Sequence, residues 1–450
     1  MNLARPEGSA PLKILVPSLH RLSTIARAAG GSAGSIALRG SSIVSNIAAV
    51  GLAIRLLGPE RYGQYVLLIA AAAWLGLAML GTGENYTKSL VKVRAGARDP
   101  QARPLAQATL LYSTMGAAGA TLISIAGLTG LMVLALADRT IFIAGMILLV
   151  GTSVSSPLVM ASSALVAEGR ITFDALFKLL QPLSLLAMVG VAYLLPPIAP
   201  GTMLIILAAA HALSVAGTRV AAFLATFQVK PLLRNLLSTP IGPVARATWP
   251  FLIIQLAAML SFQTDRFLVS SFSSFSELAS YDLLFRIFSA VYMVFSIPLL
   301  HIWRLVGTSW HDADMLRLKR VMGLYFGGGA LFWIAVTLAA VLLAPLVIEV
   351  FSGDTVTALA WPVTALIGAF FLVRGTTDVL TLSLYAMEQE RKVLPFVIAH
   401  GVTNVAFAAA GGALGGVAGL LIGQIVSFVL STQLPFLFLI SRQLRRGLAA

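Results

Sequence analysis

The sequence has no cysteine and little charge. Its 450 residues include 0 Cys, which excludes disulfide bonds, thiolate metal sites and a cysteine nucleophile. Charged residues make up 11% of the chain and hydrophobic residues 58%, whereas a soluble domain is about 25% charged. The composition therefore excludes an ordinary soluble enzyme and predicts that much of the apolar surface faces lipid.

Acidic residues are especially scarce. The chain has 17 Asp and Glu against 31 Lys and Arg, which gives a net charge of +14. Such an excess is typical of proteins that bind nucleic acid or an anionic membrane surface. The positions of the basic residues decide between these two interpretations.

Long apolar segments recur along the whole chain. A transmembrane helix needs about 20 mostly apolar residues, and about twelve segments meet this requirement. They are 35–57, 62–84, 105–137, 140–167, 173–195, 201–228, 247–271, 278–301, 320–348, 356–386, 393–411 and 414–440. The sequence thus predicts an all-α polytopic membrane protein.

The basic residues gather on one side of this topology. If the N-terminus is cytoplasmic and the spans alternate, most of the 31 Lys and Arg residues lie in cytoplasmic segments. The outer connections contain only Arg55, Arg61 and Arg139. By the positive-inside rule, we expect both termini in the cytoplasm. The net charge therefore reflects topology, and we expect no nucleic-acid partner.

A cytoplasmic connection that contains three prolines divides the spans into two groups of six. The predicted organisation is a basic cytoplasmic segment (1–34), an N-lobe with spans one to six (35–228), a linker (229–246), a C-lobe with spans seven to twelve (247–440) and a basic cytoplasmic tail (441–450). Two sets of spans are common in transporters, where the substrate site lies between the halves.

Five arginine residues lie within the predicted spans. They are Arg39, Arg219, Arg266, Arg286 and Arg374. Because a central Arg costs roughly 2.5–3.5 kcal/mol on insertion scales, such residues usually face a bundle interior or an aqueous cavity and often carry function. The small positive surplus within the spans favours an anionic substrate, since guanidinium binds phosphate with two hydrogen bonds.

Local pairing is the alternative interpretation of these charges. Three acid–base pairs are spaced four residues apart and share a helix face: Asp282 and Arg286, Arg374 and Asp378, and Glu84 and Lys88. Such pairs neutralise each other. Asp265 and Arg266 are adjacent, so their side chains point about 100° apart and we expect them not to pair. Arg39 lies close enough to the inner surface to snorkel. Arg219 lies about nine residues, roughly 13 Å, from the end of its span and has no acid nearby.

Motifs for catalysis or cofactor binding are missing from the sequence. No Gly-x-x-x-x-Gly-Lys-Ser/Thr loop for ATP is present. His211, His301 and His400 lie on separate spans, so we expect them to be hydrogen-bonded and not to be metal ligands. Gly411, Gly415, Gly419 and Gly423 recur at every fourth position and predict a face for close helix packing. We expect no catalytic residue, no metal and no cofactor. The short outer connections argue against an enzyme that acts on polysaccharide.

Three short motifs resemble a known family. Arg55–Tyr65 (RLLGPERYGQY) is similar to the first outer loop of bacterial polysaccharide transporters, the O-antigen flippase-type family of the multidrug/oligosaccharidyl-lipid/polysaccharide exporter superfamily. Asp265–Leu268, followed by Tyr281, Arg286 and Pro298, resembles the start of the second half of these proteins, and Val350–Asp354 resembles their outer loop before span ten.

The resemblance implies two six-helix lobes in a V shape that open alternately to each side of the bacterial cytoplasmic (inner) membrane. It implies that the protein flips undecaprenyl-diphosphate-linked oligosaccharide from the inner to the outer leaflet for exopolysaccharide, capsule or O-antigen synthesis. The family's cationic residues match Arg39, Lys88, Arg266 and Arg286. We add Arg219 and Arg374 to this substrate-binding set because they lie within spans. The candidates for ion coupling or pairing are Asp265, Asp282, Asp378 and Glu84.

The expected partners are therefore lipid-linked oligosaccharide and membrane lipids, with a polysaccharide polymerase and a chain-length regulator as further candidates. Two alternatives stay open. One is an ion-coupled drug or metabolite exporter of the same superfamily. The other is a membrane polysaccharide polymerase or ligase, which the short outer loops disfavour.

Overall fold

The computed structural model describes residues 32–79, 82–83, 102–134, 138–167, 170–226, 241–355 and 359–449. Within these ranges every regular element is a helix, which confirms the predicted all-α class. Glu84, Lys88, the segment 1–31 and most of the predicted linker lie outside the described residues.

The first half of the chain forms one long helix followed by a bundle. Its elements are α2 (Ser32–Trp74), η1 (Leu75–Met79), α4 (Ala102–Val133), α5 (Arg139–Gly145), η2 (Met146–Val150), α6 (Gly151–Ser155), η3 (Ser156–Val159), α7 (Met160–Ala167), α8 (Ile171–Leu194) and α9 (Pro200–Thr226). The helix α2 contains the first predicted span and the greater part of the second, which meet at a kink where Gly58 has φ 71° and Pro59 follows. Positive φ favours glycine and proline interrupts the helical hydrogen bonds, so the two residues explain the kink.

The second half begins with a broken helix and ends with a hairpin. Its elements are α11 (Ile241–Phe262), α12 (Thr264–Phe272), α13 (Phe275–His311), α14 (Met315–Ser352), η4 (Gly353–Thr355), α15 (Trp361–Ala386), α16 (Glu390–Phe428), η5 (Val429–Gln433) and α17 (Leu434–Ala449). The predicted span 247–271 is divided at Gln263 into α11 and α12. Predicted spans eleven and twelve both begin within α16, which reverses direction at Gly415 and Gly416.

Nine helices in the described part of the chain are long and apolar enough to cross a membrane. Two of them, Ala37–Leu77 and Glu390–Arg445, each contain two predicted spans because of the kinks. The pair α11–α12 accounts for the remaining predicted span. The structure therefore agrees with about twelve crossings, the number that hydropathy predicts.

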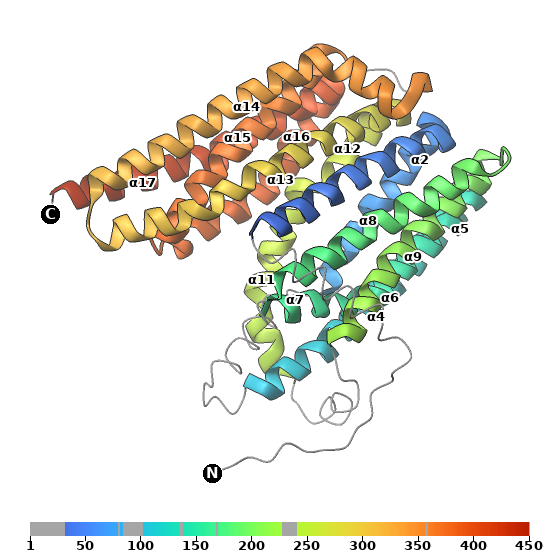
Figure 1. The fold of residues 1–450 in the computed structure, drawn as a ribbon, viewed down its shortest axis with the longest axis horizontal. Coiled ribbons are helices and arrows are strands. Elements are labelled where there is room, and N and C mark those ends of the chain that lie inside the picture. Colours follow the sequence, from blue (N-terminus) through green and yellow to red (C-terminus); the bar gives the residue numbers. More distant parts are fainter. Residues whose placement is uncertain are drawn as a thin grey trace, which may run out of the picture.

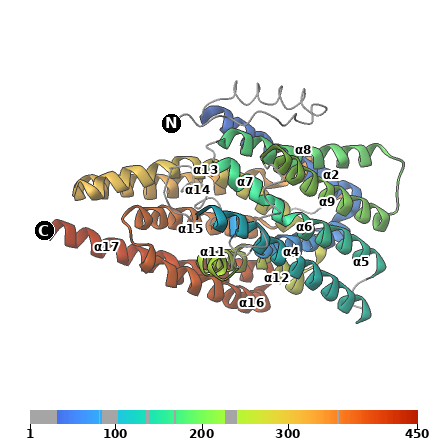
Figure 2. The ribbon, with the colours of Figure 1, turned by 90° about the horizontal axis from the view of Figure 1, so that it is seen from below.

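The helices form two diverging groups (Figure 1). One group contains α4 to α9 and the other α12 to α17, and the ribbons converge near the α2 kink and the end of α14. The helix α2 packs on α8 and α9 in the first group and on α13 in the second. The helix α11 belongs to neither group: it packs on α16 of the second and also on α4 of the first, and Figure 2 shows it between the two. The protein thus has a V-shaped fold with two contacting lobes.

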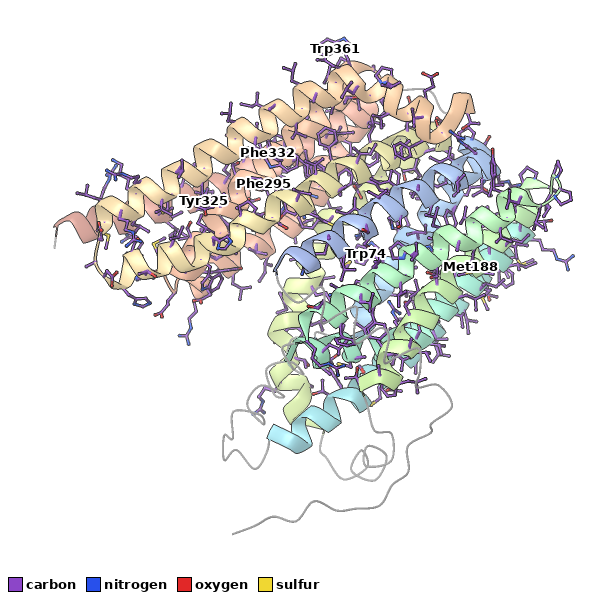
Figure 3. The ribbon with its side chains drawn as sticks, viewed as in Figure 1. Trp74, Met188, Phe295, Tyr325, Phe332 and Trp361 are labelled. Carbon is purple, nitrogen blue, oxygen red and sulfur yellow. The ribbon has the colours of Figure 1, made fainter. Side chains whose placement is uncertain are left out.

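Aromatic side chains fill the centre of the second lobe. Phe295 and Phe332, labelled in Figure 3, stack with ring centroids 5.4 Å apart between α13 and α14. Trp333 is fully buried beside them and stacks on Phe371 of α15 at 5.4 Å. Trp361, at the start of α15, instead projects from the bundle and is 70% exposed. Tryptophan at a helix end is typical of a membrane–water interface.

The glycines of α16 let its two arms pack backbone against backbone. A Cβ atom at Gly411 would overlap the carbonyl oxygen of Gly419, and one at Gly419 would overlap that of Gly411. Gly423 lies equally close to the carbonyl of Phe407. The predicted small-residue face is thus confirmed for these three positions. Gly415 lies in the turn, where a Cβ would meet no atom within 4 Å.

Gly411→Ala is expected to destabilise the protein by about 1–3 kcal/mol, because the added methyl group forces the arms of α16 apart. The control is Gly415→Ala, which places the same methyl group in open space. The measurement is the temperature at which half of the purified protein loses its monodisperse elution peak in detergent. Equal temperatures for the two variants would contradict the packing argument.

Candidate functional site

The carboxylate of Asp282 lies at the centre of a network that joins the two lobes. On α13 this fully buried group accepts hydrogen bonds from Arg266 Nε of α12 at 3.0 Å and from Arg286 Nε at 2.6 Å. The hydroxyl of Tyr62 on α2 donates to it at 2.9 Å. The predicted pairing of Asp282 with Arg286 is therefore confirmed, and Tyr62 brings the first lobe into the same network.

Asp265 and Arg266 form an ion pair, so the expectation that they would not pair is wrong. Arg266 Nη1 lies 3.2 Å from Asp265 Oδ1, and the Arg266 backbone N–H donates to the same oxygen at 2.8 Å. The reason is the helix break at Gln263, which places Asp265 in the first turn of α12. In the first turn of a helix, backbone N–H groups lack helical partners and a carboxylate can accept from them. The Asp265 carboxylate accepts from the backbone N–H of the following residue, Arg266. Tyr281 also donates to Asp265, at 2.8 Å.

The network is neutral overall, because Arg266 and Arg286 balance Asp265 and Asp282. Both arginine side chains are largely buried, at 11% and 20% exposed. Arg286 also donates to Asn46 of α2 at 3.3 Å. Two of the predicted substrate-binding arginines are therefore occupied by carboxylates in this conformation, where they hold helices together.

The convergent ends of the two lobes are tightly packed. Arg55 of α2 donates to the carbonyl oxygens of Val350 at 2.6 Å and Phe351 at 3.2 Å. These carbonyls belong to the last turn of α14, where no helical partner is available. A Cβ atom at Gly51 would lie 2.6 Å from the Phe351 carbonyl oxygen. Contacts this close exclude water, so the lobes are closed at this end.

Arg374 and Asp378 are connected through an aromatic ring. Tyr292 of α13 donates to Asp378 at 2.5 Å. The guanidinium of Arg374 lies over the rings of Phe262 at 4.1 Å and Tyr292 at 4.3 Å. The predicted i,i+4 relation thus brings the two residues onto one face, but the phenol lies between them and the cation binds ring faces.

Arg219 is a largely buried span arginine whose hydrogen-bond partners are neutral groups. Its Nη1 donates to the carbonyl of Thr152 at 3.1 Å and to Ser155 Oγ at 2.9 Å. Among the described residues no carboxylate forms an ion pair with it. Burial lowers the number of water molecules around this guanidinium, so its charge needs a counter-charge that the described residues do not supply there.

Two adjoining cavities meet at Arg219. One, of about 340 Å³, is lined also by Ser156, Gln181, His211 and Gln255. Its Ser156 Oγ is buried without a hydrogen-bond partner. Gln255 comes from α11 and donates to the Gly76 carbonyl at 2.9 Å, so a C-lobe side chain completes this N-lobe cavity.

The second cavity, of about 220 Å³, shares Arg219 and Gln181 with the first. It contains one carboxylate, Asp174, which pairs with Lys178 at 2.7 Å and accepts a hydrogen bond from Ser162. The cavity carboxylate is therefore already neutralised. The two cavities together form a space with one surplus positive charge and several neutral donors.

The remaining predicted residues have other surroundings, except His211, which lines the first Arg219 cavity. Arg39 is exposed near the start of α2, and Lys88 and Glu84 lie outside the described residues. His211 shares a hydrogen bond with Tyr65 at 3.1 Å and His400 one with Ser431 at 3.0 Å. No group of three metal-ligating side chains occurs in the described part of the chain.

Sequence reasoning missed the tyrosines that complete the ion networks. Tyr62 and Tyr281 both lie near the start of the helical segment that follows a short turn, and each donates to one buried carboxylate. This shared position was visible in the sequence, but the acceptor of each hydroxyl depends on how the lobes pack. No motif in the sequence indicated that serines and glutamines would surround Arg219.

Asp282→Ala is expected to destabilise the protein by about 3–5 kcal/mol, because it leaves two buried arginines facing each other without a counter-charge. The measurement is thermal stability of the purified protein in detergent. Glu277→Ala is the matched control, since Glu277 lies five residues earlier on α13 and is exposed. A change no larger than that of the control would show that the network is dispensable.

Neither a family model nor a curated protein matches this sequence. Solved structures do match. An inward-facing conformation of a multidrug resistance MATE family transporter of the MOP superfamily aligns with a TM-score of 0.67 and 17% identity, covering 90% of this chain and 96% of that one. An outward-facing conformation of a multidrug resistance MATE family transporter aligns with a TM-score of 0.57 and 18% identity, covering 92% of this chain and 94% of that one.

A third structure is a MOP superfamily transporter from Pyrococcus furiosus, which is described as having a binding pocket of reverse polarity. It aligns with a TM-score of 0.57 and 18% identity, covering 94% of this chain and 95% of that one. At these identities the likeness concerns the fold. The chain has the twelve-helix, two-lobe fold of MATE transporters of the MOP superfamily.

Proposed function

We propose that this protein is an alternating-access exporter that moves an amphipathic solute bearing an anionic group across the cytoplasmic membrane. The observation that carries the proposal is Arg219, a guanidinium at the junction of two cavities that forms no ion pair with a carboxylate in the described ranges. The fold supports transport, and the charge in the cavity supports an anion.

The chemistry around Arg219 suits a phosphate or a carboxylate. Guanidinium forms strong charge-assisted hydrogen bonds to such oxygens. Ser156 Oγ is a free donor in the same cavity. A volume of about 340 Å³ accommodates a charged headgroup or a small solute. A long apolar tail or a sugar chain would have to extend outside it.

The conformation fits the inward-open half of a transport cycle. The lobes are closed at the end where α2 kinks, and the positive-inside rule predicts that this end faces outward. The TM-score against the inward-facing transporter is 0.67, higher than the TM-score of 0.57 against the outward-facing one. Substrate would then enter from the cytoplasmic side or the inner leaflet.

Within this proposal, undecaprenyl-diphosphate-linked oligosaccharide is the specific substrate candidate. The diphosphate would bind Arg219, and the outer-loop motif of Arg55–Tyr65 resembles transporters of such lipids. Arg266 and Arg286 would contact it only after the Asp282 network opens, while Arg374, Arg39 and Lys88 remain predicted contacts. A polymerase and a chain-length regulator would act on the product outside.

The second candidate is an ion-coupled drug or metabolite exporter, which the multidrug transporters among the structural neighbours favour. A cationic drug would be repelled by Arg219, so an anionic metabolite fits better. The Pyrococcus furiosus neighbour is described as having a different function because of its pocket polarity. Pocket charge is therefore a reasonable criterion for choosing between substrates in this fold.

Arg219→Ala is expected to reduce transport by about ten- to a hundredfold, the effect of losing a hydrogen bond to a charged group. Arg219→Lys should retain part of the activity, because it keeps the charge and loses the fork geometry. The assay is a deletion strain complemented with each variant, in which lipid-linked oligosaccharide trapped on the inner leaflet is quantified. Arg320→Ala, an exposed position on α14, is the control.

Three results would separate the candidates. Lipid-linked oligosaccharide accumulating inside in the Arg219→Ala strain supports the flippase. Normal polymer export with loss of efflux of an anionic metabolite supports the exporter of small solutes. Wild-type transport of both in Arg219→Ala, with normal protein levels in the membrane, would refute the assignment of the Arg219 cavity.

A further inference from the structure

An apolar groove lies where α2 and α4 of the first lobe meet α12 and α13 of the second. Its volume is about 410 Å³. We define it as the α4 groove by six of the residues that line it, Gln64, Leu75, Ile123, Gly127, Ile141 and Phe267. Ile123 lies within the candidate span Tyr112–Val133 and is 71% exposed. The groove is therefore open at a surface that faces lipid hydrocarbon.

The α4 groove has the length of one lipid leaflet. Leu75 follows Gln64 by eleven positions on α2, which is a rise of about 16 Å along a helix. Half of the hydrocarbon core of a bilayer is about 15 Å thick. Gln64 stands at one end, and the other polar side chain of the wall, Ser124, donates its proton to the Ala120 carbonyl at 2.7 Å. The dimensions and the wall fit an extended acyl chain.

Gly127 leaves space for such a chain. A Cβ atom at this exposed position of α4 would meet no atom within 4 Å. Glycine in a helix is less favourable than alanine by about 1 kcal/mol, and here it relieves no close contact with the protein. Because Gly127 lines the groove, a large side chain at this position would take the space of an occupant.

An ion pair lies at the Gln64 end of the α4 groove. Arg61 Nη1 donates to Gln64 Oε1 and to Asp138 Oδ2, each at 2.9 Å. Asp138 Oδ1 accepts from the backbone N–H of Ile141 at 2.7 Å. Since Gln64 and Ile141 both line the groove, the pair connects two of its walls at this end.

Both members of the pair can bind a further group. Asp138 lies between the candidate spans Tyr112–Val133 and Arg139–Leu165, which places it at the level of lipid headgroups. The side chains of Arg61 and Asp138 are 32% and 47% exposed. The two described hydrogen bonds of Arg61 use Nη1, so Nε and Nη2 can donate to an anion, and each oxygen of Asp138 has a second lone pair.

The charges around the pair favour a headgroup that carries a cation. Glu60 and Arg139 adjoin the pair in the sequence, and Glu277 lies in the first turn of α13 on the other lobe; all three are exposed. Together with the ion pair they make two cations and three carboxylates. A net negative charge repels an anionic lipid, whereas alternating signs match a zwitterion.

We propose that the α4 groove binds a phospholipid whose headgroup contains a primary ammonium, such as phosphatidylethanolamine. One acyl chain lies in the groove, the phosphate accepts from Arg61, and the ammonium donates to Asp138. A choline headgroup has no N–H to donate, and phosphatidylglycerol has no cation. The positive-inside rule predicts that this end faces outward, so the lipid belongs to the outer leaflet.

The bound lipid favours closure of the lobes at this end. Phe267 and Phe275, which also lines the groove, come from the second lobe. A Cβ at Gly63 would lie 2.5 Å from the Phe275 carbonyl oxygen, so the lobes touch beside the groove. When they part here, both phenylalanines leave its wall. A ligand shifts an equilibrium by its difference in affinity for the two states, so the lipid stabilises the present conformation.

Native mass spectrometry tests the groove. The purified protein is mixed with equal amounts of phosphatidylethanolamine, phosphatidylcholine and phosphatidylglycerol that have the same acyl chains, and phosphatidylethanolamine should bind in preference. Gly127→Phe should lose this bound lipid. The control is Gly119→Phe, another α4 glycine with no atom within 4 Å of its Cβ but outside the groove. Equal binding of phosphatidylethanolamine by the two variants would overturn the proposal.

Asp138→Asn tests the headgroup contact. Asparagine also caps a helix, so α5 should be kept while the charge is lost. The preference for phosphatidylethanolamine over phosphatidylcholine should fall about tenfold, the effect of losing a hydrogen bond to a charged group. Glu349→Gln, at an exposed carboxylate near the end of α14, should retain the preference. Equal affinity of the wild type for all three lipids would refute recognition of the headgroup.

Spin labels test the effect on the lobes. Because the chain has no cysteine, labels can be attached to cysteines introduced at Leu224 of α9 and Leu316 of α14, both exposed. Replacing phosphatidylcholine vesicles by vesicles with phosphatidylethanolamine should raise the population with the longer distance. Gly127→Phe should remove this response and Gly119→Phe should keep it. An unchanged or shorter distance in the wild type would contradict the stabilisation of this conformation.

A competition experiment separates this lipid from a transported one. Undecaprenyl phosphate at an equal concentration should not displace phosphatidylethanolamine from the wild-type protein. Displacement would overturn the proposal, because the groove would then hold the tail of a substrate. None of these measurements involves transport, so a failed prediction for Arg219 leaves them intact, and the converse also holds.

Discussion

The carboxylate of Asp282 is the acceptor on which the arrangement of the lobes depends. It takes donors from α2, α12 and α13 at once. A buried carboxylate is stable only when its lone pairs are occupied, so these three helices must stay within hydrogen-bond distance of it in the present conformation. Opening the closed end requires the Tyr62 hydroxyl to leave Asp282 and the Asn46 side chain to leave Arg286, while the two arginines remain on the same lobe as their acceptor. The network can therefore part at these two hydrogen bonds and stay neutral.

The arginines within the spans have different partners and therefore different roles. Arg266 and Arg286 are compensated and hold helices, Arg374 lies between aromatic rings, and Arg219 keeps a free charge beside two cavities. These charges differ in their partners, and the proposed binding role falls to Arg219, which forms no ion pair with a carboxylate of the described residues.

Hydropathy and glycine spacing were sufficient to predict the spans, the two halves and the packing face of α16, because these properties are local. The ion pair of Asp282 and Arg286 could also be predicted, because the two residues lie four positions apart on one helix. The sequence could not reveal the break at Gln263 that lets Asp265 bind Arg266, nor the phenol of Tyr292 between Arg374 and Asp378. That Arg219 binds neutral groups and no carboxylate of the described residues became visible only once the helices around it had been placed. Long-range partners depend on tertiary packing, which no short motif encodes.

The hydrogen bonds of Arg55 have a consequence for how this sequence can vary. Arg55 binds the main-chain carbonyls of positions 350 and 351, which every amino acid carries. The side chains at those two positions are thus free to drift during evolution without loss of the contact. Position 55, in contrast, needs a long side chain with several donors. Among relatives, the arginine would persist while its partners change, so covariation between these positions would be weak although they touch.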